Sequence, residues 1–309
     1  MQTLERTRLL FDLQGFVVIR NVLTKEEVAA ANTAIDAHTW HERGAPVRNS
    51  KDETKFAGDM KTGRLDMAGM LGWEDPHRRV FRKMLAHPGL VSTLHALVGE
   101  GYRLDHSPLV LGQNQGAEGF GLHGGPLTAS GRFVPQLQYR CVQGEIYNTL
   151  LGVSFQLSDH NAGDGGFCVV RGSHKMNFPI TKAMLDGDDA DFLETCVEQP
   201  VTQAGDVVLF SEATVHGCLP WTPADRQRRV ALFRFAPATH AFARGYCSER
   251  WPEAFLDGMS EQELAVMQPP FHPMYDRATL SEDAQSTISQ GRAQVKKDFD
   301  LEVFGTKYY

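Results

Sequence analysis

The sequence has few cysteines, and none of them form a recognisable pair. Five cysteines are spread over 309 residues, and no two stand in a Cys-x-x-Cys arrangement. Zinc ribbons and dithiol redox motifs are therefore unsupported. Scattered single cysteines are typical of a reducing compartment, where most act as small buried hydrophobic residues.

Long apolar runs and a basic surplus are also missing. No stretch approaches the ~18 apolar residues of a membrane-spanning helix, and the opening MQTLERTRLLFDLQG has no apolar signal core. The formal net charge is −7, whereas nucleic acid and anionic membranes attract basic surfaces. We expect a cytoplasmic protein that acts on a small molecule and binds neither nucleic acid nor membrane.

The first hundred residues contain most of the helix signals. In TKEEVAAANTAIDAH, residues 24–38, Thr24 is a predicted N-cap with Glu27 three residues on, a capping box before an apolar stripe. GFVVIRNVL, just before it, reads as a short strand. Further helices are expected at about 76–86 and 88–98, and a helix followed by a loop at about 258–275.

The pattern of residue types changes at about residue 102. Short β-rich runs alternate there with Gly, Asn and Asp clusters, which predicts a sandwich, barrel or jelly roll. No strand-helix-strand alternation runs through this half, so a Rossmann-type sheet is not expected. We expect a single catalytic domain over 1–309, with an N-terminal helical decoration (1–100), a β core (101–240) and a C-terminal helix and tail (241–309).

Two of the twelve histidines, His123 and His216, each follow a predicted strand, and Arg228 lies twelve residues after His216. Non-haem iron oxygenases use two imidazoles and a carboxylate as a facial ligand set that leaves positions open for cosubstrate and dioxygen. Arginine suits a 2-oxoglutarate carboxylate because its planar donors bind bidentately. Arg228 and Arg229 point to opposite strand faces, so only one can reach such a site.

Several sequence blocks carry a family resemblance: DLQGFVVIRNVLTKEEV, HPGLVSTLHALVG, LHGGP, GVSFQLSDHNAGDGGFCVVRGSHK and HGCLPWTPADRQRRVALFRF. Over roughly residues 11–240 the chain resembles the phytanoyl-CoA dioxygenase (PhyH-like) family. The resemblance implies a double-stranded β-helix of the cupin-like jelly-roll type, with Fe(II), 2-oxoglutarate and O2. It also implies that His123 and His216 bind iron and that Arg228, rather than Arg229, binds 2-oxoglutarate.

The same resemblance suggests secondary contacts. Gln115 lies near a polar cosubstrate contact of the family, and Cys218 stands where the family often has a serine near the cosubstrate. We expect substrate recognition from the N-terminal region and the polar loops around residues 43–72.

The chain departs from the family where the carboxylate ligand should be. The family pattern is His-x-Asp, but here the third residue is Gly125. This resembles the His-x-Gly motif of iron halogenases, in which chloride or bromide binds iron at the open position. Halogenation of an unactivated C–H bond is therefore the leading hypothesis. The second is hydroxylation, with Glu118, Glu145 or water filling the site, and the third is a binding protein without catalysis.

Overall fold

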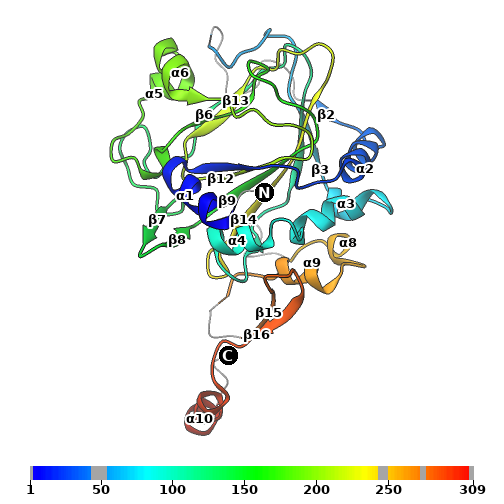
Figure 1. Cartoon of the computed structure of the whole chain (residues 1–309), viewed down its shortest axis with the longest axis vertical. Coiled ribbons are helices and arrows are strands. Elements are labelled where there is room, and N and C mark those ends of the chain that lie inside the picture. The colour runs from blue at the N-terminus through cyan, green and yellow to red at the C-terminus, as the bar shows by residue number, and fades with distance from the viewer. Residues whose placement is uncertain (1–2, 43–53, 243–249, 272–275, 306–309) are drawn as a thin grey trace.

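The computed structural model describes residues 3–42, 54–242, 250–271 and 276–305. Two antiparallel sheets form its centre, with helices around them (Figure 1). The major sheet has the order β1-β12-β9-β14-β5-β3-β2, with β4 paired to β14. The minor sheet has the order β11-β10-β13-β6. This arrangement confirms the expected mainly-β jelly roll.

The strands of both sheets are short. Those of the major sheet are β1 (Phe16–Ile19), β2 (His41–Glu42), β3 (Leu65–Ala68), β4 (Arg103–Leu104), β5 (Leu109–Gln113), β9 (Leu151–Gln156), β12 (Val207–Ser211) and β14 (Arg228–Ala236). Those of the minor sheet are β6 (Phe120–His123), β10 (Gly166–Val170), β11 (Val197–Glu198) and β13 (His216–Leu219). A separate hairpin joins β7 (Tyr139–Val142) to β8 (Glu145–Asn148).

Strand β14 shows how the period of two divides the molecule. Alternate side chains along a strand point to opposite sheet faces. One set packs into the main hydrophobic core: Ala231, Phe233 and Phe235. The other set lines a cavity between the sheets: Arg228, Val230, Leu232 and Arg234. The major sheet therefore has an apolar face covered by helices and a second face that carries charged groups.

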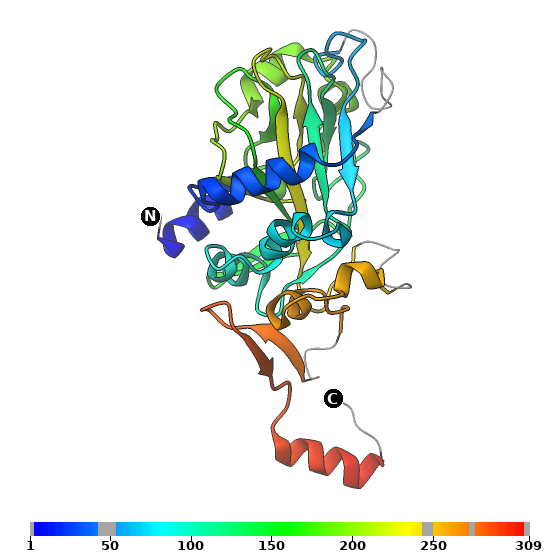
Figure 2. The same cartoon turned by 90° about the vertical axis from the view of Figure 1, so that its right-hand side faces the viewer.

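Helices of the N-terminal region cover the apolar face (Figure 2). They are α1 (Leu4–Gln14), α2 (Lys25–Asp36), α3 (His77–Lys83) and α4 (Val91–Val98). The capping box of Thr24 and Glu27 is formed as expected. The predicted helix at 76–86 ends in a 3₁₀ turn, Met84–Ala86, and the next one begins only at Val91. His87 is extended because it precedes Pro88, and a proline disfavours the helical conformation of the residue before it.

The N-terminal hundred residues supply strands as well as helices. Strand β1, in the predicted GFVVIRNVL segment, pairs with β12, and β3 pairs with β5. Without β1 and β3, the strands β12 and β5 would have unpaired backbone groups at the edges of the sheet. The region therefore completes the major sheet, and strand β3 was not anticipated from the sequence.

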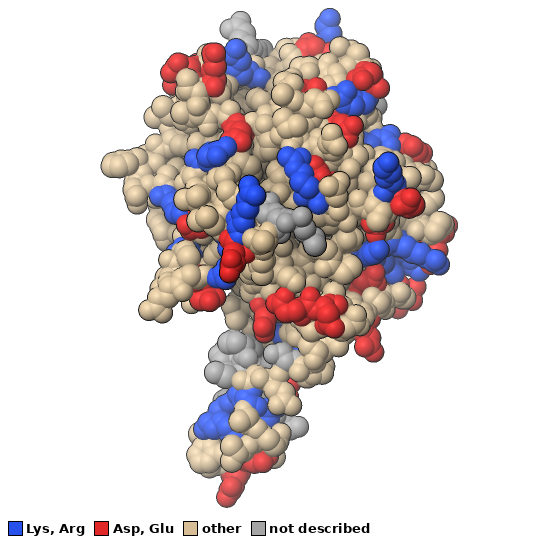
Figure 3. Space-filling model, viewed as in Figure 1, with Lys and Arg blue, Asp and Glu red and all other residues tan. Residues whose placement is uncertain are grey.

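The remaining elements lie at the periphery. They are α5 (Lys182–Asp186), α6 (Ala190–Cys196), α8 (Glu253–Leu256), α9 (Glu261–Val266), the hairpin β15 (Arg277–Leu280) and β16 (Ser286–Ser289), and α10 (Gln294–Phe304). Figures 1 and 2 show α10 projecting away from the body. No helix in the described ranges combines the length and apolarity needed to cross a bilayer. On the face in Figure 3, basic and acidic side chains are interspersed.

Candidate metal centre

The two histidines singled out in the sequence are cross-strand neighbours. His216 on β13 pairs directly with His123 on β6 in the antiparallel minor sheet. Directly opposed residues on one sheet face have Cβ atoms about 5 Å apart, and here the ring centroids are 4.3 Å apart. Strand pairing thus brings together two residues that are far apart in the sequence.

Backbone carbonyls fix the orientation of both rings. Nδ1 of His216 donates to the carbonyl of Thr214 at 2.8 Å, and Nδ1 of His123 donates to that of Gly121 at 3.1 Å. A carbonyl oxygen only accepts, so the proton of each neutral ring is on Nδ1 and Nε2 keeps its lone pair. This arrangement is typical of metal-binding histidines.

Both rings favour the neutral form that metal binding requires. Burial lowers the pKa of His216 below its ordinary value. Loss of surrounding water, and then the neighbouring His216, lower the pKa of His123, although this residue keeps solvent access at the end of β6. Two neutral imidazoles with free Nε2 atoms suit a divalent transition metal such as iron.

Arg228 lies in the same cavity, which has a volume of about 170 Å³. The residue is only 3% exposed, and its Nη1 donates to Oε1 of Gln113 at 3.1 Å. Its Nε has no hydrogen-bond partner, and no carboxylate among the described residues pairs with it. A buried guanidinium without a counter-ion is costly. The cavity therefore lacks one anionic group, as a site for a ligand carboxylate would.

Arg229, the neighbour of Arg228, points to the other face. It binds Asn32 at 3.1 Å and Asp36 at 2.7 Å, both on α2. Of the two arginines that spacing alone left open, Arg228 is the one in the cavity.

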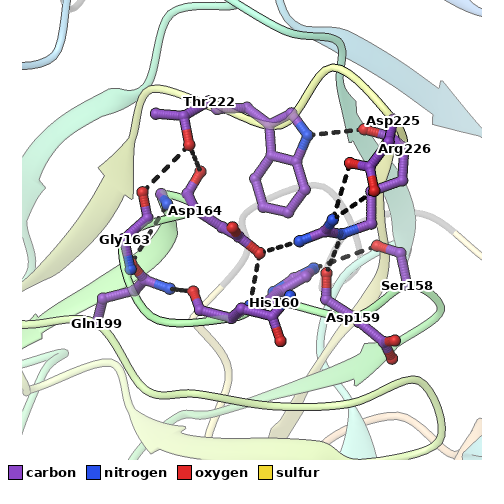
Figure 4. A network of polar contacts seen from close by, with 12 residues as sticks. Ser158, Asp159, His160, Gly163, Asp164, Gln199, Thr222, Asp225 and Arg226 are labelled. Carbon is purple, nitrogen blue, oxygen red and sulfur yellow. Dashed lines mark hydrogen bonds and ion pairs between the residues drawn. The ribbon is translucent and has the colours of Figure 1, made fainter.

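A further arginine, Arg226, serves the scaffold. Figure 4 shows it between Asp164 and Asp225. Its guanidinium carbon lies 5.8 Å from the ring centre of Trp221, whose Nε1 donates to the Arg226 carbonyl at 3.0 Å. The network holds the turn before β10 against the segment that leads into β14. It thereby fixes the start of the strand that carries Arg228.

The expected cosubstrate contacts divide into one that lines the cavity and one that does not. Cys218 lines it, and its thiol donates to Oε1 of Gln113 at 3.1 Å. Gln115 is exposed in the turn after β5 and lies outside the cavity lining. Gln113, two residues earlier and fully buried, occupies the position beside Arg228 instead.

Gly125 does not face the cavity. Its φ is +91°, and a Cβ atom there would lie 2.7 Å from Cε of Met176 and 3.0 Å from Cγ2 of Val215. These are apolar side chains of a separate core cluster. Gly125 is also not among the residues that line the cavity.

The two candidate replacement carboxylates also lie elsewhere. Glu145 is exposed in the β7–β8 hairpin, and Glu118 is buried but outside the cavity lining. Glu212, which sequence reasoning missed, is also outside the cavity lining but lies next to His216. Oε2 of Glu212 lies 3.6 Å from Nε2 of His216, and Oε1 lies 2.5 Å from Nε of Arg234.

Glu212 is ionised in this setting. Burial alone would raise the pKa of its carboxyl, but the charge of the Arg234 guanidinium outweighs that effect and lowers the pKa well below the ordinary value. The sequence does contain a sign of this role: Glu212 stands inside the otherwise apolar segment GDVVLFSEATVHG, four residues before His216. A charged residue in such a segment is almost never buried unless it is paired.

The rest of the cavity is mostly apolar, with one additional cation. Leu109, Leu111 and Phe120 contribute to its walls, and the guanidinium of Arg64 lies 5.0 Å from the centre of the Phe120 ring. Arg64 belongs to the 43–72 segment expected to meet substrate. Residues 43–53 of that segment lie outside the described residues.

Comparison with known proteins places the chain among dioxygenases. The profile of the family described as "Phytanoyl-CoA dioxygenase (PhyH)" matches residues 11–230. No curated protein matches the chain significantly.

Solved structures share the fold at low sequence identity. HygX from Streptomyces hygroscopicus, with nickel and 2-oxoglutarate bound, superposes with a TM-score of 0.62 at 22% identity, covering 76% of this chain and 88% of that one. The 2-oxoglutarate-dependent epimerase SnoN from nogalamycin biosynthesis gives 0.56 at 18% identity, with 87% and 95% covered. The carbocyclase SnoK gives 0.53 at 19% identity, with 80% and 91% covered.

Proposed function

The chain belongs to the phytanoyl-CoA dioxygenase (PhyH) family of iron- and 2-oxoglutarate-dependent oxidoreductases, and from this premise we propose that it hydroxylates an aliphatic C–H bond of a small molecule. One observation carries the proposal. A pair of imidazoles with free Nε2 atoms shares a cavity with a buried arginine that lacks a counter-ion. These are the groups needed to hold a metal and a dicarboxylate side by side.

Each residue has a defined task. His123 and His216 would hold Fe(II) through Nε2, and Arg228 would bind the far carboxylate of 2-oxoglutarate, oriented by Gln113. With the ion bound, the reaction consumes O2 and 2-oxoglutarate and yields succinate, CO2 and the hydroxylated product, one oxygen atom going to each of the two organic products. The apolar walls exclude water, which strengthens the arginine–carboxylate attraction.

The substrate is proposed to be a small molecule with an anionic or strongly polar group. Structures of fold relatives contain small molecules: HygX with hygromycin B, and SnoN with nogalamycin RO. In this chain the guanidinium of Arg64 lies at the cavity wall beside Phe120, with its Nε 3.3 Å from Oδ1 of Asp66. A guanidinium stacked on a ring offers in-plane donors to a ligand oxygen.

Hydroxylation is preferred over halogenation because of the surroundings of Gly125. In the halogenase hypothesis the missing side chain makes room for chloride or bromide at the metal. Here the Cβ direction of Gly125 leads to Met176 and Val215. Halogenation stays a prediction from the His-Gly-Gly sequence and is tested by the same assay.

The test is uncoupled turnover followed by product analysis. The protein, freed of metal and then supplied with Fe(II), 2-oxoglutarate and air, should release succinate. His216→Ala should reduce this release at least ~100-fold, because one of two imidazole ligands is removed. Absence of iron-dependent succinate from the wild type would refute the proposal. With substrate and excess bromide, a hydroxylated product supports it and a brominated product establishes the alternative.

A further inference from the structure

The carboxylate missing from the His-x-Asp pattern is replaced nearby. Glu212 lies in the short connection between β12 and β13 and is 6% exposed. One of its oxygens is 3.6 Å from the free nitrogen of His216, while Arg234 holds the other. We infer that Glu212 is the carboxylate ligand of the metal that His123 and His216 bind. The inference rests on the proposed function.

The distances fit this role after a small adjustment. Two ligand atoms about 2.1 Å from a metal and at right angles to each other are about 3 Å apart. The separation of 3.6 Å between Glu212 Oε2 and His216 Nε2 exceeds this by a few tenths of an ångström. No three His, Cys, Asp or Glu side chains of the described residues already form a metal-holding group. A rotation of the Glu212 carboxylate toward the imidazoles would complete one.

The glycine directly after His123 allows the approach. Gly124 has φ +87°, and a Cβ atom there would lie 2.8 Å from the carbonyl oxygens of both Glu212 and Thr214. Any side chain at 124 would push the turn away from the segment that carries Glu212. Close backbone packing therefore requires glycine at position 124.

The charge balance also fits. Two neutral imidazoles and one carboxylate leave a ferrous ion with a single positive charge, as the facial triad of oxygenases does. Arg234 binds only Oε1, so Oε2 remains free to coordinate, and the guanidinium orients the carboxylate from outside. The competing explanation is that Glu212 only pairs with Arg234 to hold the strands together.

Substitution of Glu212 and of Arg234 separates the two explanations. Glu212→Gln and Arg234→Met both break the Glu212–Arg234 pair, so both should lower the melting temperature. Glu212→Gln should weaken Co(II) or Mn(II) binding to the metal-free full-length protein by at least ~10-fold in titrations and alter the Co(II) absorption spectrum, whereas Arg234→Met, which keeps the carboxylate ligand, should weaken binding less. Glu118→Gln, in a glutamate that is also buried, is the matched control and should bind metal like the wild type.

The outcomes are distinguishable from failure of the proposed function. If the wild type binds no metal, the proposed function fails. If His216→Ala loses metal but Glu212→Gln binds as tightly as the wild type, the Glu212 assignment is wrong and the function stands. Should Glu212→Gln not fold, a crystal of the wild type grown with Co(II) decides the matter. Its anomalous map should place a Glu212 oxygen on the ion, and water or chloride there with Glu212 still on Arg234 would overturn the inference.

Discussion

The two faces of the major sheet differ in the side chains that the same strands place on them. On the helix-covered face of β14, Phe233 and Phe235 are fully buried among apolar side chains. On the cavity face, Arg228 is almost as buried but has an unsatisfied nitrogen. The first face supplies stability, and the second carries Arg228, a charge that no carboxylate in the described part of the chain neutralises. Buried polarity without a partner therefore marks the functional face better than burial alone does.

The largest effect expected from this comparison is on stability. Phe233→Ala should lower the free energy of unfolding by about 3–5 kcal/mol, because it leaves a cavity in the packed face. Leu232→Ala, its neighbour on the cavity face, should cost about half of that or less, since Leu232 already borders empty space. Denaturant unfolding of the two variants measures the difference. Equal losses would show that the two faces are packed alike.

A smaller effect is expected for the two arginines at the start of β14, and here the residue on the cavity face should matter more than its neighbour. Arg228→Met should raise the KM for 2-oxoglutarate about 10–100-fold, equivalent to ~1.4–2.8 kcal/mol, and should not lower stability, because a buried charge without a counter-ion is removed. Arg229→Met is the control: it loses an exposed ion pair worth about 0–1 kcal/mol and should leave KM unchanged. Succinate assays and thermal melts report both quantities, and a KM effect in Arg229→Met would contradict the facial assignment.

A pH-dependent effect on stability is expected from a histidine away from the cavity. Burial lowers the pKa of His174 to about 4, and its Nε2 donates to the carbonyl of Asp12. Below pH ~6.5 the unfolded chain takes up a proton there that the folded chain refuses. Stability should therefore fall as pH drops from ~6.5 to ~4, by at most about 1.4 kcal/mol per pH unit from this group, with no contribution above that window. Unfolding measurements on His174→Gln should show a flatter pH dependence; an unchanged slope would exclude His174 as its source.

Much of this architecture was accessible from the sequence, where periodicity and known spacing carry the information. Alternation along RRVALFRF placed Arg228 and Arg229 on opposite faces, and the structure agrees. The capping box predicted the start of α2. Strand β3 is not predictable from the sequence, because its four residues, LDMA, are too few to show an alternating pattern. Its conformation depends mainly on hydrogen bonding to β5.

The chemistry at the cavity was harder to read. Gln113 and Gln115 differ by one strand period, and only the position of the turn decides which is buried. Closeness to His123 along the chain suggests Glu118 and Glu145 as carboxylates for the site. The sheet instead brings Glu212 from the end of another strand to His216. Which residues flank a site across strands depends on register, and register is a tertiary property.

The strand order gives the histidine pair unequal surroundings. β6 is the outermost strand of the minor sheet, whereas β13 lies inside it. His216 is consequently 4% exposed, while His123 stays open to solvent at the rim. Under the proposed function, an incoming ion would meet His123 first and His216 second, so loading and exchange of the ion would proceed over a sheet edge without any strand having to separate.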